Sequence, residues 1–91
     1  MKLHYVLWKG EGKAIPIVCV HGVTSNSRYY CALAEELTKE RDVYSYDLRG
    51  RGDSDKPEYS YGIECHALDL HNFLNHLKMP AVHLLGHSFG A

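Results

Sequence analysis

Five residues near the end of the chain have the types and spacing needed for nucleophilic catalysis. Residues 86–90 read Gly-His-Ser-Phe-Gly, which matches the pattern G-x-S-x-G, and they follow an apolar run over 81–85. A serine on a sharp turn after a strand projects its hydroxyl from the sheet edge, and only small residues fit two positions before and after it. The backbone amide of Phe89 then points to where a substrate oxyanion would form. The pattern predicts a nucleophile at Ser88; a glycine-rich turn without chemistry is the alternative.

Two further motifs follow short runs of strand-forming residues in the same way. His21-Gly22-Val23-Thr24 comes after the apolar run 15–20. The stretch DLRGRGDS, residues 47–54, comes after a run over 42–47 that is rich in β-branched and aromatic residues. Runs of this length between turn-forming residues are typical of strands. Each of the three motifs therefore begins where a predicted strand ends.

The elements between these motifs predict an α/β fold. Four runs are expected to be strands, the first of them a hairpin strand because the turn-like KGEG follows it: 3–8, 15–20, 42–47 and 81–85. One helix is expected to begin at Ser27 as its cap, with Tyr30, Leu33, Ala34 and Leu37 on its apolar face. A second is expected over about 60–77, with these residues on its apolar face: Ala67, Leu70, Phe73, Leu74 and Leu77. Strands alternating with amphipathic helices predict an N-terminal hairpin strand followed by βαβαβ units around a parallel sheet.

Taken together, HG, DLRGRGDS and GHSFGA closely resemble the motifs of the α/β-hydrolase superfamily, in this order and each at a predicted strand end. The resemblance covers nearly the whole chain, from about Leu3 to Ala91. It implies a serine hydrolase that acts on carboxylic esters or related acyl substrates through an acyl-enzyme on Ser88, with no metal or organic cofactor. Thioesterases, peptidases and carbon–carbon bond hydrolases share this scaffold, and GHSFGA does not separate them.

The same resemblance implies a role for each motif position. Ser88 would be the nucleophile, and the backbone amides of Val23 and Phe89 would form the oxyanion hole. The other motif positions would have structural roles, shaping the loop, the strand end or the turn: His21, Gly22, Asp47, Arg49, Gly86 and Gly90. Val23 stands where some lipases and esterases continue a glycine run, so the HGGG type of oxyanion hole is not expected.

The histidines do not predict a second catalytic or metal site. His87 is next to Ser88, but adjacent residues on a turn diverge, so we expect it to pack or to line the site rather than to act as the base. His66, His71 and His76 recur every five residues, which rotates each by about 140° around a helix. They share no face, so the spacing does not predict a metal site.

Composition and charge restrict the partners. The 91 residues are 45% hydrophobic and 23% charged with a formal net charge of −1, so no binding of nucleic acid or an anionic membrane is expected. The longest apolar stretch, 15–20, is far too short to span a bilayer. The three cysteines form no CxxC pair and no hydrophobic leader is present, so we expect reduced thiols in a cytoplasmic protein. The expected partner is a small-molecule ester or acyl substrate, and the oligomeric state is left open.

The triad partners of Ser88 have no place on this chain. In the α/β-hydrolase fold the order is serine, then aspartate or glutamate, then histidine, whereas every acidic residue and every histidine here precedes Ser88. We therefore expect residues 1–91 to be the N-terminal part of a single α/β-hydrolase domain whose C-terminal part lies elsewhere, and to be inactive alone. The alternative is a non-catalytic α/β-hydrolase-fold protein that acts as a binding or scaffolding module; such a module needs no strained serine turn, which favours the enzyme.

Overall fold

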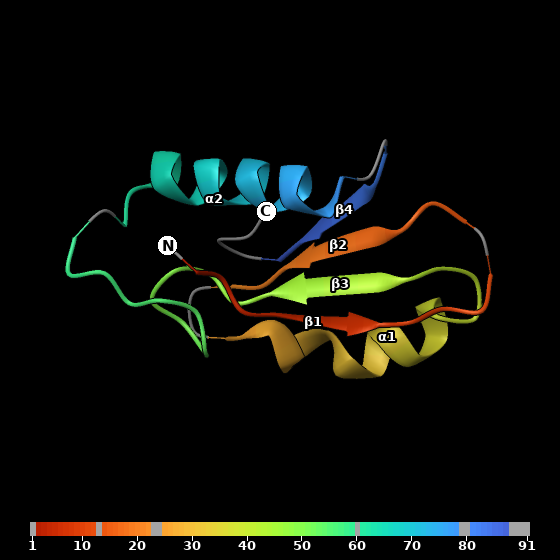
Figure 1. Cartoon of the computed structure of the whole chain (residues 1–91). Helices are drawn as coiled ribbons and strands as arrows, with labels where there is room; N and C mark the ends of the chain where they lie inside the picture. Colours follow the sequence, from red (N-terminus) through yellow and green to blue (C-terminus); the bar gives the residue numbers. More distant parts are fainter. Residues whose placement is uncertain (1, 13, 23–24, 60, 79–80, 88–91) are drawn as a thin grey trace.

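The computed structural model describes residues 2–12, 14–22, 25–59, 61–78 and 81–87. Two short strands follow each other at the start of the chain, and helices then alternate with two further strands (Figure 1). In chain order the elements are β1 (Tyr5–Trp8), β2 (Ile17–Val20), the 3₁₀ helix η1 (Ser27–Tyr30), α1 (Cys31–Leu37), β3 (Val43–Tyr46), α2 (Ile63–Leu77) and β4 (His83–Gly86). This is the α/β architecture that the sequence predicts, and each predicted strand is present within a few residues of its expected bounds.

The sheet has the strand order β1-β3-β2-β4. Strands β2, β3 and β4 run parallel to one another, and β1 pairs antiparallel with β3. The carboxyl ends of the three parallel strands therefore lie at one edge of the sheet, where the three sequence motifs begin. Residues Val20, Tyr46 and Gly86 share one level of the sheet, because Val20 is in register with both of the others.

The predicted hairpin between the first two strands is wrong. Strand β1 pairs with β3 instead, because β3 and β4 occupy both edges of β2. The KGEG segment after β1 packs its backbone against the connection between α1 and β3. The N–H of Gly10 donates to the carboxylate of Asp42 (2.7 Å), and the N–H of Glu11 donates to the carbonyl of Thr38 (2.9 Å). A Cβ on Gly10 would lie 2.9 Å from the nitrogen of Asp42, so glycine serves a close approach here and not a hairpin turn.

Helices cover both faces of the sheet (Figure 1). Helix α2 lies on one face and α1 on the other. Alternate residues of the strands point to the two faces, and two buried clusters result. The cluster under α2 comprises Val18, Val20, Tyr46, Leu48 and Phe73. The cluster under α1 comprises Cys19, Tyr30, Ala34 and Val43. Strand β2 contributes to both clusters, as expected for a strand that is buried on both faces.

The helix starts differ from the expected ones. Asn26, not Ser27, caps the first helical segment, and its side-chain oxygen accepts the N–H of Arg28 (2.9 Å). Helix α2 begins at Ile63, with Gly62 as its cap residue. On the expected apolar faces, Ala67 and Leu33 are exposed, whereas Phe73 is buried. In the described part of the chain, no helix is long and apolar enough to cross a bilayer.

The structure has all three cysteines as free thiols. Burial raises the pKa of the Cys19 thiol to about 11, so this residue stays a neutral part of the core under α1.

Candidate active site

Four of the predicted site residues fall outside the described part of the chain: Val23, Ser88, Phe89 and Gly90. The structure does describe the strand ends that lead into them. Gly86, the last residue of β4, is paired with Val20, the last residue of β2. His21-Gly22 and His87 follow these two positions directly, so the HG and G-x-S-x-G motifs leave the sheet from adjacent parallel strands. Asp47 and Arg49 follow β3 on the other side of β2.

The carbonyl oxygen of Val20 joins the ends of β2 and β4. It accepts the N–H of His87 (3.2 Å) and the hydroxyl of Tyr30 (2.8 Å). The imidazole of His87 stacks on the ring of Tyr29, with the ring centroids 5.2 Å apart. Tyr29 in turn packs edge-to-face against Tyr30. The side chain of His87 therefore packs against the start of the first helix, in agreement with the packing role expected from the sequence.

His21 is completely buried at the end of β2. Its Nδ1 lies 2.5 Å from the carbonyl oxygen of Gly22, and its Nε2 lies 3.0 Å from the backbone nitrogen of Leu48. Burial lowers the pKa of His21, and this effect outweighs the opposing effects of the Gly22 carbonyl and the Asp47 carboxylate. His21 thus connects the HG motif to the loop that follows β3.

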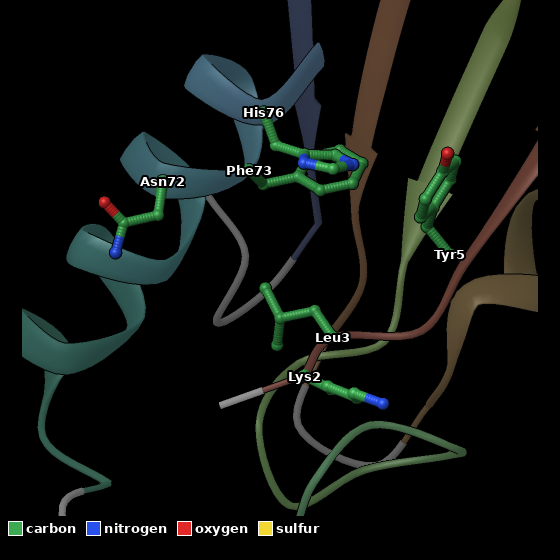
Figure 2. Close-up of a pocket in the computed structure, with 6 residues that line it drawn as sticks. All are labelled: Lys2, Leu3, Tyr5, Asn72, Phe73 and His76. Atoms are coloured by element: carbon green, nitrogen blue, oxygen red, sulfur yellow. The ribbon is translucent and has the colours of Figure 1, made fainter.

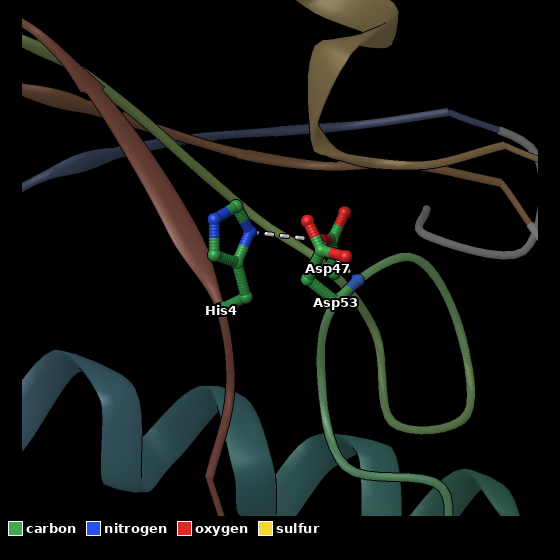
Figure 3. A group of neighbouring side chains, drawn as sticks. All are labelled: His4, Asp47 and Asp53. Carbon is green, nitrogen blue, oxygen red and sulfur yellow. Dashed lines mark hydrogen bonds and ion pairs between the residues drawn. The ribbon is translucent and has the colours of Figure 1, made fainter.

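Asp47 is a buried hub at the end of β3 (Figure 3). Its Oδ1 accepts the N–H of Ser27 (2.6 Å), and its Oδ2 accepts Nδ1–H of His4 (2.9 Å) and the N–H of Asp53 (3.0 Å). Its carbonyl accepts the hydroxyl of Ser54 (2.5 Å). Burial alone would raise the pKa of this carboxyl, but the N–H donors of Asp53 and Ser27 outweigh it and the pKa lies below its usual value. The ionised carboxylate therefore ties three separate segments together, which is an architectural role.

His4, Asp47 and Asp53 form the one group among the described residues whose ligand atoms lie close enough to hold a metal, all within 4.8 Å of one another. Both carboxylate oxygens of Asp47 already accept protein hydrogen bonds. His4 Nδ1 donates to Asp47, so this nitrogen presents no lone pair to a cation. The contacts among the three residues are those of a hydrogen-bonded hub.

Arg49 joins the loop after β3 to helix α2. Its Nε donates to Oδ2 of Asp69 (2.6 Å) and its Nη2 donates to Oδ1 (2.7 Å). The two side chains are only 11% and 10% exposed. This is the bidentate arrangement in which a guanidinium binds a carboxylate most strongly.

Replacing Arg49 is therefore expected to weaken the fold. Arg49→Ala leaves the buried Asp69 carboxylate without its partner and should lower the free energy of unfolding by about 3 kcal/mol. Arg49→Lys keeps the charge but loses the fork and should cost about half as much. Urea unfolding of the intact protein measures both values. Lys39→Ala is the matched control, since Lys39 forms an ion pair with Glu36 (2.9 Å) in which both side chains are exposed, and its loss should cost at most about 0.5 kcal/mol. Equal costs for Arg49→Ala and Lys39→Ala would contradict this prediction.

Sequence reasoning missed the polar partners of the motif residues. The sequence predicts Tyr30 only as part of the apolar face of a helix, whereas its hydroxyl donates a hydrogen bond to the carbonyl of Val20. Ser27 is expected as a cap, whereas its N–H binds Asp47. Asp69 could have been recognised from the sequence, because it lies one helical turn before Phe73 on the buried face of α2. A carboxylate at such a position needs a cationic partner.

A pocket of about 320 Å³ lies beside the N-terminal segment (Figure 2). It opens between the N-terminal segment and α2, and its lining residues are Lys2, Leu3, Tyr5, Asn72, Phe73 and His76. Tyr5 begins β1 opposite Tyr46, the last residue of β3, and Leu3 packs against the cluster that contains Val20, Tyr46 and Leu48. The pocket therefore adjoins the end of β3.

Comparison with known proteins identifies the family. Residues 15–91 match the alpha/beta hydrolase fold family, so the chain belongs to it. Over its full length the chain is 38% identical to N-formylmaleamate deformylase of Pseudomonas putida, covering 34% of that protein. It is 36% identical to 2-(acetamidomethylene)succinate hydrolase of Mesorhizobium japonicum, covering 91% of the chain and 29% of that protein. The chain thus spans about a third or less of the length of each of these relatives.

Solved structures agree with this assignment. The enol-lactonase from Burkholderia xenovorans superimposes with a TM-score of 0.88 at 31% identity, over 97% of this chain and 34% of the enzyme. An epoxide hydrolase, CorEH, superimposes with a TM-score of 0.87 at 32% identity, over 97% of this chain and 30% of that one. These relatives are hydrolases of several kinds, built on the same arrangement of strands and helices.

Proposed function

We propose that the protein containing this chain is a serine hydrolase that acts on carboxylic esters or related acyl substrates. The observation that carries the proposal is the pairing of Val20 with Gly86. This pairing places the ends of β2 and β4, after which the HG and G-x-S-x-G motifs continue, side by side. Open α/β sheets bind their ligands at the carboxyl ends of the strands. The hydrogen bonds of Val20, His21 and Asp47 hold together the segments that follow these strands.

In this proposal Ser88 is the nucleophile. Its Oγ adds to the acyl carbon, and the backbone amides of Val23 and Phe89 stabilise the oxyanion that forms. The leaving alcohol or amine departs with the proton that the serine gives up, and water then releases the acid from the acyl-enzyme. In the order of this fold the acid and the base follow the serine, whereas every histidine and acidic residue of this chain precedes it.

Three of the relatives support a small acyl substrate, although an epoxide hydrolase is also among the similar structures. A deformylase, a 2-(acetamidomethylene)succinate hydrolase and an enol-lactonase all bear names of enzymes that act on acyl groups of small molecules. We propose the same substrate class for this protein, in the cytoplasm and without a metal or organic cofactor.

Labelling with a serine-directed fluorophosphonate tests the proposal. The intact protein should be labelled, and Ser88→Ala should abolish the labelling, since the hydroxyl is the group that reacts. His87→Gln is the neighbouring control and should retain most of the labelling, because the His87 side chain packs on Tyr29. Labelling that survives in Ser88→Ala would refute the assignment of the nucleophile. An intact protein that is folded but unlabelled would favour the non-catalytic binding module.

A further inference from the structure

The pocket beside the N-terminal segment has an apolar wall that is built on the core. Leu3 and Tyr5 line it from the start of the chain, and Phe73 lines it from α2 (Figure 2). The rings of Tyr5 and Phe73 contact each other edge to face, with their centroids 5.2 Å apart. Phe73 is buried, and Leu3 packs against the same core cluster. Because cores are close-packed, this wall keeps its shape.

Hydrogen bonds to the loop after β3 hold the N-terminal side of the pocket in place. The N–H of Lys2 donates to Oδ2 of Asp55 (2.7 Å), and the N–H of Asp55 donates to the carbonyl of Lys2 (2.9 Å). The N–H of His4 donates to Oγ of Ser54 (2.8 Å), and the N–H of Asp47 donates to the carbonyl of His4 (2.8 Å). The pocket is therefore formed before a ligand arrives, which reduces the entropy that binding must lose.

The polar side chains that line the pocket can all donate hydrogen bonds. Lys2 supplies an ammonium group, and Asn72 and His76 on α2 supply an amide and an imidazole. None of the described lining residues is acidic, and none of the ion pairs in the described part of the chain includes Lys2. The carboxylate of Asp55 already accepts the backbone N–H of Lys2. The pocket thus offers a positive charge and N–H donors beside an apolar wall.

We propose that this pocket binds a small aromatic carboxylate. The ring of the ligand packs against the wall formed by Leu3, Tyr5 and Phe73, and its carboxylate accepts hydrogen bonds from Lys2 and from the polar side chains of α2. Contacts between aromatic rings stabilise a complex beyond the area that they bury, and a hydrogen bond between charged groups is stronger than a neutral one. The volume of about 320 Å³ is at the lower end of the range for ligand pockets, so it fits one ring with a short side chain.

Other classes of small ligand match only part of this lining. The Lys2 ammonium would repel a cation. An inorganic anion would make no use of the aromatic wall, and a purely apolar molecule would leave the polar side chains without a partner in the ligand. The lining residues are not those to which the proposed function assigns chemistry. The pocket can therefore bind its ligand whether or not Ser88 is a nucleophile.

Isothermal titration of the intact protein with 3-phenylpropanoate tests the class of ligand. We expect saturable binding with a Kd below about 1 mM, as suits a ligand of this size in a preformed pocket. The neutral analogue 3-phenylpropanamide should bind about tenfold more weakly because it lacks the charge, and acetate should bind about tenfold more weakly because it lacks the ring. The proposal is wrong if the amide binds as tightly as the carboxylate, or if no saturable binding is seen up to about 10 mM.

Two pairs of variants test whether the probe binds in this pocket. Asn72→Trp places a large ring in the pocket from an exposed position and should abolish binding. Asn75→Trp is the matched control, because Asn75 is an exposed asparagine of the same helix that lies outside the lining and donates to His71 (3.2 Å). Lys2→Gln removes the positive charge and should weaken binding about fivefold. Lys39→Gln removes the charge of an exposed lysine outside the lining and should leave the Kd unchanged.

Each result of these titrations bears on the proposal. Wild-type affinity in both Asn72→Trp and Lys2→Gln would place the probe elsewhere on the protein and overturn the proposal. An equal loss in Asn72→Trp and Asn75→Trp would show that tryptophan disturbs α2, and the comparison of Lys2→Gln with Lys39→Gln then decides. The backbone N–H of residue 2 still donates to Asp55 in Lys2→Gln, so this variant keeps the fold of the segment.

Discussion

Gly52→Ala is expected to lower the free energy of unfolding by about 3–5 kcal/mol, a loss that only severe substitutions reach. Gly52 has a φ of +51°, a region that L side chains rarely adopt. A Cβ at this position would lie 2.6 Å from Oδ1 of Asp47 and closer still to the rest of the carboxylate. The carboxylate cannot move aside without giving up its bonds to Ser27, His4 and Asp53. The substitution therefore strains the backbone and displaces the buried hub at once.

Gly62→Ala is the matched control for this measurement. Gly62 has a φ of −66°, and a Cβ there would meet nothing within 4 Å. Urea unfolding of the intact protein should show a change of at most about 1 kcal/mol for Gly62→Ala, since alanine is only a poorer cap residue than glycine. If Gly52→Ala were no more destabilising than this control, Asp47 would not be the rigid hub described above.

Much of the fold could be predicted from the sequence because its signals are local. The runs IPIVCV and DVYSYD each contain a strand of the sheet, and AVHLL contains all of β4 but its last residue, because short apolar and β-branched runs between turns are typical of strands. The pairing of β1 could not be predicted in the same way. KGEG has the composition of a hairpin turn, and only the occupied edges of β2 send β1 to β3 instead. Strand pairing is a property of the whole sheet, and no local pattern carries it.

In the candidate site too, local motifs could be predicted from the sequence, whereas contacts between distant residues could not. The motifs located His21, Asp47 and Arg49 through their resemblance to the α/β-hydrolase family. Their partners come from distant parts of the chain: Leu48 for His21, Asp69 for Arg49, and His4 for Asp47. A single sequence does not show which residues meet across the fold. The start of the first helix illustrates the limit, since Asn26 and Ser27 are both good caps and only the contact with Asp47 distinguishes their roles.

Residues 1–91 expressed alone should self-associate and show no turnover of a p-nitrophenyl ester. Within the described structure β4 is an edge strand that pairs only with β2, and Leu84 on it is 56% exposed. The strand sequence His83–Gly86 carries no lysine, glutamate or proline that would discourage pairing with another chain. An exposed, nearly uncharged edge of this kind is a template for intermolecular strands. Turnover should be absent because Ser88 without a base and an acid is a weak nucleophile.

Sedimentation velocity with two leucine variants tests which edge is responsible. Leu84→Lys places a charge on the β4 edge and should shift most of the material to the monomer. Leu7→Lys is the matched control, because Leu7 is a 40% exposed leucine on the opposite edge strand, β1, which already has Lys9 beside it. It should leave the association unchanged, since Lys9 already discourages pairing at that edge. Dissociation by Leu7→Lys but not by Leu84→Lys would assign the association to β1 instead. A well-folded wild-type monomer whose turnover depends on Ser88 would contradict both parts of the prediction, and would mean that a base upstream of the serine reaches it against the order of the fold.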